Sequence, residues 1–255
     1  MSFALPIFDA HLHIIDPRFP LVPNQGYVPP AFTSTNYLQR LQPYRLAGGA
    51  IVSGSFQAFD QGYLIAALAE LGAAFVGVTQ LPASTTDQTL IELHDAGVRA
   101  LRFNVQRGGS EDLRHLEKFA QRVYDMVGWH SELYIDSSAL EELSPLLLRL
   151  PAVSIDHLGL SQNGFATLLK LVEQGVRVKA TGFGRVDFVV QSALQALYAA
   201  NPAALMFGTD LPSTRAPRAY QDSDYLLVLE TLGETAARQV FSTNAQAFYR
   251  PRKIV

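Results

Sequence analysis

Short apolar runs recur along the whole chain, separated by stretches whose apolar residues follow a helical period. Eight runs are nearly continuous in Val, Ile, Leu, Phe and Ala, as expected for strands that are covered on both faces. They occupy residues 7–13, 49–56, 74–81, 98–105, 132–137, 152–160, 177–182 and 205–210. Between them, residues 86–96, 163–174 and 187–200 each carry an apolar face of helical period. The pattern therefore predicts eight alternations of strand and helix.

Eight such alternations within 255 residues predict a (β/α)8 TIM barrel, an α/β fold. A doubly wound open sheet is the alternative, although no Gly-rich phosphate loop follows any predicted strand. No linker or repeat divides the chain, so residues 1–255 are expected to form a single barrel domain. The proline-rich residues 16–30 exceed an ordinary connection in length and are expected to lie over the barrel mouth as a lid or wall.

Composition narrows the classes of function. The hydrophobic fraction of 48% can fill a large core, and the net charge of −3 argues against a nucleic-acid partner. The chain has no cysteine, so any metal would be held by His, Asp or Glu. We see no signal peptide and no run of about 18 apolar residues. A cytoplasmic protein with no membrane partner is therefore expected.

The candidate chemistry lies at the carboxyl ends of the predicted strands, where barrel enzymes place their active residues. His11 and His13 share one face of the first strand, because positions two apart point the same way. Two imidazoles on one rigid element suit a metal ion or a polarised oxygen. His157 follows the sixth strand and Asp210 ends the eighth, so all four side chains are expected to converge.

Arginines and other polar residues surround these four positions. Six of them are candidate substrate-binding residues: Arg102, Asn104, Arg107, Tyr134, Arg185 and Arg215. Arginine binds a carboxylate bidentately, so a group of arginines at one mouth would fix the orientation of an acidic substrate. Whether Tyr134 or Asp136 faces the barrel interior depends on the register of the fifth strand, which the sequence leaves open.

Structural roles are the alternative for several of these residues. Asp210 could cap a helix, and His157 could be an ordinary core histidine. Arg102 and Arg185 could form ion pairs with nearby carboxylates. Lys179, within the seventh strand, could be an ordinary strand lysine. His130 enters the fifth strand at the end away from catalysis.

The order of these motifs resembles that of the amidohydrolase superfamily of metal-dependent hydrolases. The resemblance rests on His11-Leu12-His13, on His157, on Gly208-Thr209-Asp210 and on the C-terminal residues 244–250. Many members of that superfamily carry a carboxylated Lys or a Glu on the fourth strand and a His on the fifth. This chain instead has Arg102 on its fourth strand. The resemblance, with this departure on the fourth strand, therefore implies one metal at most, held by His11, His13, His157 and Asp210.

Within the superfamily, the chain is most similar to the branch of lactonases that includes 2-pyrone-4,6-dicarboxylate hydrolases. Four residues of this chain resemble those that contact the substrate carboxylates in that branch: Arg102, Asn104, Arg107 and Arg185. The branch is thought to work without a bound metal, at least in part. The resemblance thus implies either no cofactor or a single divalent metal such as zinc.

These observations lead to a function hypothesis. We expect a hydrolase that opens the ester ring of a small carboxylated lactone such as 2-pyrone-4,6-dicarboxylate. Asp210 would activate water, and His11, His13 and His157 would polarise the carbonyl. The alternatives are a mononuclear zinc-dependent amidohydrolase or decarboxylase, and a non-catalytic barrel that binds small acids. The expected partner is the lactone alone, with a homodimer left open.

Overall fold

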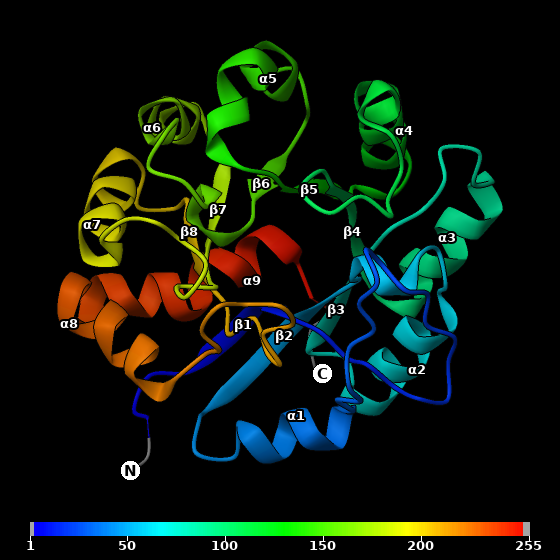
Figure 1. The fold of residues 1–255 in the computed structure, drawn as a ribbon, viewed down its shortest axis with the longest axis horizontal. Coiled ribbons are helices and arrows are strands. Elements are labelled where there is room, and N and C mark those ends of the chain that lie inside the picture. Colours follow the sequence, from blue (N-terminus) through cyan, green and yellow to red (C-terminus); the bar gives the residue numbers. More distant parts are fainter. Residues whose placement is uncertain (1–2, 252–255) are drawn as a thin grey trace.

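In the computed structural model, which describes residues 3–251, eight strands pair in parallel in the order of the chain (Figure 1). The strands are β1 (Ile7–Leu12), β2 (Leu46–Val52), β3 (Phe75–Thr79), β4 (Val98–Asn104), β5 (His130–Tyr134), β6 (Val153–Ile155), β7 (Arg177–Ala180) and β8 (Leu205–Phe207). Almost every strand residue is buried. This agrees with the prediction of strands covered on both faces, because helices lie outside the sheet and side chains fill its interior.

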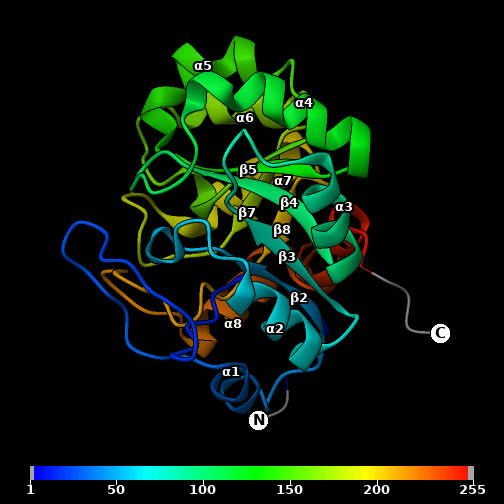
Figure 2. The ribbon, with the colours of Figure 1, turned by 90° about the vertical axis from the view of Figure 1, so that its right-hand side faces the viewer.

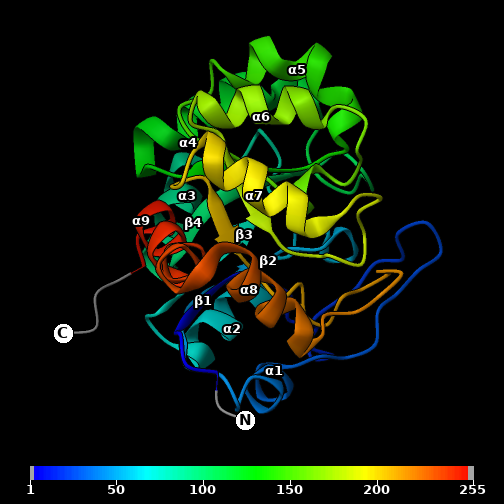
Figure 3. The ribbon, with the colours of Figure 1, turned by 90° about the vertical axis from the view of Figure 1, so that its left-hand side faces the viewer.

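Helices surround the strands on all sides, as Figures 2 and 3 show. They are α1 (Ser34–Arg40), α2 (Gly62–Leu71), α3 (Asp87–Ala96), α4 (Leu116–Val127), α5 (Leu140–Leu147), α6 (Phe165–Glu173), α7 (Val190–Ala200), α8 (Asp222–Arg238) and α9 (Asn244–Tyr249). The predicted (β/α)8 barrel is thereby confirmed.

Helix α3 illustrates how local sequence sets the bounds of an element. The Thr86 hydroxyl accepts a hydrogen bond from Thr89 N at 3.2 Å and caps the first turn. Leu90 and Leu93 are buried against the barrel. The helix ends at Gly97, whose φ of 117° favours glycine. The helix predicted over residues 86–96 is therefore confirmed, and its ends are set by the Thr86 cap and by Gly97.

The observed strands differ in their bounds from those predicted, by one to three residues at an end for six of them. The fifth is His130–Tyr134 rather than 132–137, and the eighth ends at Phe207 rather than at residue 210. The second and the sixth differ most. The second begins three residues earlier than expected and ends at Val52, because Ser55–Gln57 turn into a short 3-10 helix. The sixth ends at Ile155 rather than continuing to residue 160. There His157 and Leu158 adopt φ values of 52° and 53°, which extended backbone cannot accommodate.

The first and last strands are joined by the segments that follow them. Asp210 N donates to His11 O, and His13 N donates to Leu211 O, both at 2.7 Å. The buried Asp9 carboxylate also accepts hydrogen bonds from Thr209, at 2.8 Å from N and 2.6 Å from Oγ1. These contacts hold the ends of β1 and β8 in register, so residues 200 positions apart in the chain meet at one place.

The two ends of the barrel differ. Helix α9 lies against one end, where the Tyr249 hydroxyl donates to Ala10 O at 3.2 Å and to Glu132. At the other end, the proline-rich loop of residues 16–30 and the loop after β8 project side by side (Figures 2 and 3). Asn24 and Arg215 connect these two loops by hydrogen bonds. The proline-rich loop therefore forms a wall at the mouth, as expected from the sequence.

Candidate active site

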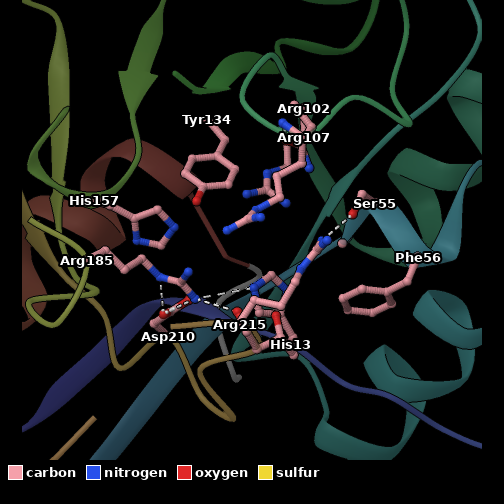
Figure 4. Close-up of a pocket in the computed structure, with 13 residues that line it drawn as sticks. His13, Ser55, Phe56, Arg102, Arg107, Tyr134, His157, Arg185, Asp210 and Arg215 are labelled. Atoms are coloured by element: carbon pink, nitrogen blue, oxygen red, sulfur yellow. Dashed lines mark hydrogen bonds and ion pairs between the residues drawn. The ribbon is translucent and has the colours of Figure 1, made fainter. Parts of the chain in front are cut away.

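The four residues predicted to converge lie together at the carboxyl end of the barrel. Figure 4 shows three of them, His13, His157 and Asp210. The His11 ring lies 5.0 Å from that of His13 and 4.8 Å from that of His157, measured between centroids. Asp210 Oδ1 lies 3.8 Å from Nε2 of His11 and 3.8 Å from Nε2 of His13. All four residues are buried.

Three buried polar atoms of this cluster have no hydrogen-bond partner in residues 3–251: His11 Nε2, His157 Nδ1 and Asp210 Oδ1. Buried polar atoms are almost always hydrogen-bonded, so these unpaired atoms need an explanation, above all His11 Nε2 and Asp210 Oδ1, which lie 3.8 Å apart. A substrate oxygen, a water molecule or a cation between His11 and Asp210 would satisfy these two. The arrangement is therefore that of a binding site rather than of a closed core.

Backbone geometry supports the same conclusion. His157, Asp210 and Arg215 have φ values of 52°, 60° and 56°, in the left-handed region that favours glycine. Each such conformation costs on the order of 1 kcal/mol or more, and they gather at functional sites. Here the strained backbone holds two of the four clustered side chains in place.

A cavity opens beside the cluster. Its lining includes all six residues predicted to bind substrate: Arg102, Asn104, Arg107, Tyr134, Arg185 and Arg215. A wider outer chamber shares four of them with the cavity: Arg107, Tyr134, Arg185 and Arg215. Figure 4 shows the guanidinium groups and the Tyr134 ring pointing toward this space. Tyr134 lines both spaces, whereas Asp136 lines only the outer one and accepts hydrogen bonds from Ser138 and Ser161.

Two of the arginines are already ion-paired. Arg185 contacts Asp210 Oδ2 through Nε at 2.8 Å and through a terminal nitrogen at 2.7 Å. Arg102 contacts Asp156 Oδ2 at 2.9 Å and donates to Ser53 O at 2.5 Å. The ion pairs that the sequence left as an alternative for these arginines are therefore present, and both residues also line the cavity.

The positive charges of the other two arginines are not neutralised by an ion pair within the described residues. Within residues 3–251, the Arg107 guanidinium makes no hydrogen bond or ion pair, while its backbone N donates to Asn104 Oδ1 at 3.0 Å. Among the described residues, Arg215 binds only neutral groups, namely Asn24 and Ser55, and lies 4.9 Å from the centre of the Tyr27 ring. Two uncompensated positive charges at the mouth favour an anionic ligand.

The clustered histidines are uncharged near neutral pH. Burial lowers the pKa of His11, and the negative charge of the nearby Asp156 offsets this lowering only in part. Burial and the nearby His11 lower the pKa of His13 well below its usual value, and burial with Arg185 does the same for His157. Neutral imidazoles can each donate through one nitrogen and accept through the other.

Sequence reasoning missed a charged network inside the barrel beneath the cavity. Lys179 on β7 contacts Glu132 on β5, and its Nζ lies 3.4 Å from Asp156 Oδ1 and 3.3 Å from His11 Nδ1. All four side chains are fully buried. A lysine and a glutamate within two strands of the barrel were the available signal, but only the tertiary structure shows that they meet.

This network predicts an acid-sensitive fold. Although burial alone would raise the pKa of Glu132, the charge of Lys179 and the hydrogen bond from His130 hold it well below the usual 4.5. An acid whose pKa is lowered on folding stabilises the folded protein fully at a pH above the pKa that the acid has in the unfolded chain. This stabilisation is lost as the pH falls toward the lower pKa that the acid has in the folded protein. We expect the free energy of unfolding in urea to fall by about 2 kcal/mol between pH 5 and pH 3 on account of Glu132. A Glu132→Gln variant that loses as much as the wild type over this range would contradict the assignment.

Comparison with known proteins identifies the family. The family model described as amidohydrolase matches residues 8–250, nearly the whole chain. The chain belongs to the amidohydrolase family. A 2-pyrone-4,6-dicarboxylate hydrolase from Comamonas testosteroni is 28% identical over 187 residues, which cover 68% of this chain and 61% of that protein. A D-galactarolactone isomerase from Agrobacterium fabrum is 26% identical over a longer match that covers 98% of this chain and 92% of that protein.

Solved structures share the amidohydrolase fold over nearly the whole chain. A crystal structure of an Agrobacterium tumefaciens protein has a TM-score of 0.85 at 23% identity and covers 99% of this chain and 98% of its own. A probable 2-pyrone-4,6-dicarboxylic acid hydrolase from Acinetobacter baumannii, solved with citric acid bound, has a TM-score of 0.83 at 20% identity. The match covers 96% of this chain and 99% of that one.

In residues 3–251, no helix combines the length and the hydropathy needed to cross a bilayer.

Amidohydrolases often hold a divalent metal, and one group of residues here has the donors for it. His11, His157 and Asp210 each offer a ligand atom, and these atoms lie within 4.8 Å of one another. These three donors fit a single cation, provided that His11 presents a lone pair to it. His13 is not part of this group, although the sequence made it a candidate ligand.

Proposed function

We propose that this protein hydrolyses the ester ring of a small carboxylated lactone, of which 2-pyrone-4,6-dicarboxylate is the leading candidate. One observation carries the proposal. Asp210 has one oxygen held by Arg185 and the other without a hydrogen-bond partner, aimed at two histidines beside a cavity rich in arginine. The lactone-acting relatives support the choice of substrate class.

In this proposal, Asp210 is the general base. Its Oδ1 takes a proton from a water molecule as the water oxygen attacks the lactone carbonyl carbon. Arg185 keeps the carboxylate in position through Oδ2. When the ring C–O bond breaks, the departing oxygen receives that proton back from Asp210. The products are one carboxylic acid, which releases its proton to the solvent at neutral pH, and one hydroxyl group, so one water is consumed in each turnover.

The histidines would share the remaining work. His13 Nδ1 lies 2.7 Å from Val52 O, and a carbonyl oxygen only accepts, so this nitrogen carries the proton. Neutral His13 therefore offers Nε2 as an acceptor, which suits the attacking water better than the carbonyl. His11 and His157 are left to polarise the carbonyl oxygen, where one donor is worth roughly 2.7–4 kcal/mol of barrier.

Arg107 and Arg215 would bind the substrate carboxylates, because their charges are not neutralised within the described part of the chain. Tyr134 and Asn104 line the same cavity and would contact the ring. If a metal is bound, His11, His157 and Asp210 would hold it, and it would polarise the lactone carbonyl as a Lewis acid.

We expect the purified protein to contain at most one equivalent of divalent metal. The residues described offer one group of three donors, and the positions on the fourth and fifth strands that would build a second site hold Arg102 and Tyr134 or Asp136. A second cation beside the Arg102 guanidinium would be repelled at low dielectric. Elemental analysis of protein purified without chelator measures this, and two equivalents of zinc or manganese per chain would refute it.

The decisive experiment is turnover of 2-pyrone-4,6-dicarboxylate and of D-galactarolactone in water enriched in oxygen-18. The proposal predicts a ring-opened acid that carries one labelled oxygen. The second candidate, favoured by the relative that covers 98% of this chain, is a lactone isomerase, whose product would carry no label. Binding of carboxylated lactones without any turnover would overturn both and favour a barrel that only binds small acids.

A further inference from the structure

Lys179 occupies an unusual place for a lysine. Its side chain is fully buried inside the barrel, between β5 and the cluster of candidate catalytic residues. It contacts the Glu132 carboxylate, and its Nζ lies 3.4 Å from Asp156 Oδ1 and 3.3 Å from Nδ1 of His11. Two buried carboxylates around one ammonium compensate its charge. Its contact with His11 remains to be explained.

The contact constrains where His11 carries its proton. An ammonium group can only donate hydrogen bonds, so Nδ1 of His11 must accept and cannot itself be protonated. Asp156 Oδ1 lies 3.5 Å from the same nitrogen and is the alternative partner, to which a protonated Nδ1 would donate. An imidazole whose Nδ1 accepts a hydrogen bond carries its one proton on Nε2. That nitrogen is the buried atom without a partner that faces Asp210.

The neighbouring histidine has the opposite arrangement. His13 donates from Nδ1 to Val52 O and so presents the lone pair of Nε2 to the same Asp210 oxygen. The two histidines of the first strand thus direct one donor and one acceptor toward one place. A lactone and its attacking water need this combination, since the carbonyl oxygen accepts and the water donates.

We propose that Lys179 is a positioning residue that fixes His11 in the tautomer with its proton on Nε2, which makes His11 the hydrogen-bond donor to the substrate carbonyl. The identity of the acceptor rests on the proposed function, whereas the tautomer does not. A protonated Nε2 has no lone pair for a metal ion. Lys179 therefore also weakens the one candidate metal group, because His11 belongs to it.

The tautomer is measured directly by NMR of protein with nitrogen-15 in its histidines, with the His11 signals assigned from a His11→Gln variant. In the wild type we expect His11 to be protonated on Nε2 and His13 on Nδ1. A wild-type His11 protonated on Nδ1 overturns the proposal, whatever the variants do. This readout needs no substrate, so a protein that fails to open lactones would refute the proposed function without affecting the result.

The matched variants separate the lysine's role at His11 from its role in the fold. Lys179→Met combined with Glu132→Gln removes one charge of each sign, so the barrel interior keeps its net charge. Here we expect the His11 proton to move to Nδ1, where Asp156 can accept it, and zinc to bind at least tenfold more tightly. With lactone substrates, kcat should fall by about 10²–10³ with little change in KM.

Glu132→Gln alone is the control, because it keeps the lysine. We expect this variant to retain the wild-type tautomer and zinc affinity, even if its unfolding temperature falls. A double variant that is folded by its NMR spectrum and still has His11 protonated on Nε2 overturns the proposal. The proposal is also overturned if Glu132→Gln alone shifts the His11 tautomer as far as the double variant does.

Discussion

Replacement of Asp210 by asparagine is expected to lower kcat for lactone opening by about 10²–10⁴, the range of a lost general base. An amide has the size and shape of the carboxylate but cannot take a proton from water at neutral pH. Arg185, which now holds Asp210 Oδ2, would remain in the cavity and keep its positive charge for the substrate. Binding of the substrate should therefore persist while turnover is lost.

The measurement pairs steady-state kinetics with calorimetric titration of the intact substrate into the variant. Asp136→Asn is the matched control, because Asp136 lies in the outer chamber and its carboxylate accepts hydrogen bonds from Ser138 and Ser161. We expect less than a threefold change in kcat for this control. A loss below about tenfold for Asp210→Asn would exclude Asp210 as the base.

Replacement of Arg102 by methionine is expected to destabilise the protein by about 3–5 kcal/mol, the usual cost of leaving one member of a buried ion pair alone. Arg102 is buried and binds the fully buried Asp156, while its other terminal nitrogen donates to Ser53 O. Removing the guanidinium would leave a carboxylate and a carbonyl oxygen without this partner. Urea unfolding at pH 7 measures the effect.

Arg107→Met is the matched comparison, because this guanidinium has no ion-pair or hydrogen-bond partner within residues 3–251. We expect its free energy of unfolding to stay within about 0.5 kcal/mol of the wild type. Its KM for a carboxylated lactone should rise at least tenfold with kcat little changed, since carboxylate binding is shared by ground and transition states. Equal destabilisation by the two substitutions would contradict the distinction between a paired and a free arginine.

Much of the site could be predicted from local patterns. His11 and His13 were expected on one face because strand side chains alternate with a period of two, and their rings do lie together. His157 and Asp210 were expected beside them because parallel strands bring their carboxyl ends to one edge. Each of these inferences uses only the spacing of residues and the geometry of one element, so one sequence is enough.

Other features depended on contacts between distant parts of the chain. Asn24 meets Arg215 across the mouth, although 191 positions separate them in sequence. The early end of β6 follows from the left-handed backbone at His157, which an apolar run through residue 160 does not reveal. Neither can be read from periodicity, because periodicity describes which face a residue occupies and not which side chain it will touch.

The sequence by itself determined that this chain forms a barrel whose histidines, aspartate and arginines gather at one end. Only the tertiary structure decided which partner each of them has: Arg102 is bound by Asp156, Arg107 is unpaired, and Tyr134 rather than Asp136 lines the inner cavity. The physical reason is that hydrophobic burial is a property of single positions and repeats along the chain. Charge pairing and proton placement depend on distances of about 3 Å between residues far apart in sequence, which the packed barrel alone sets.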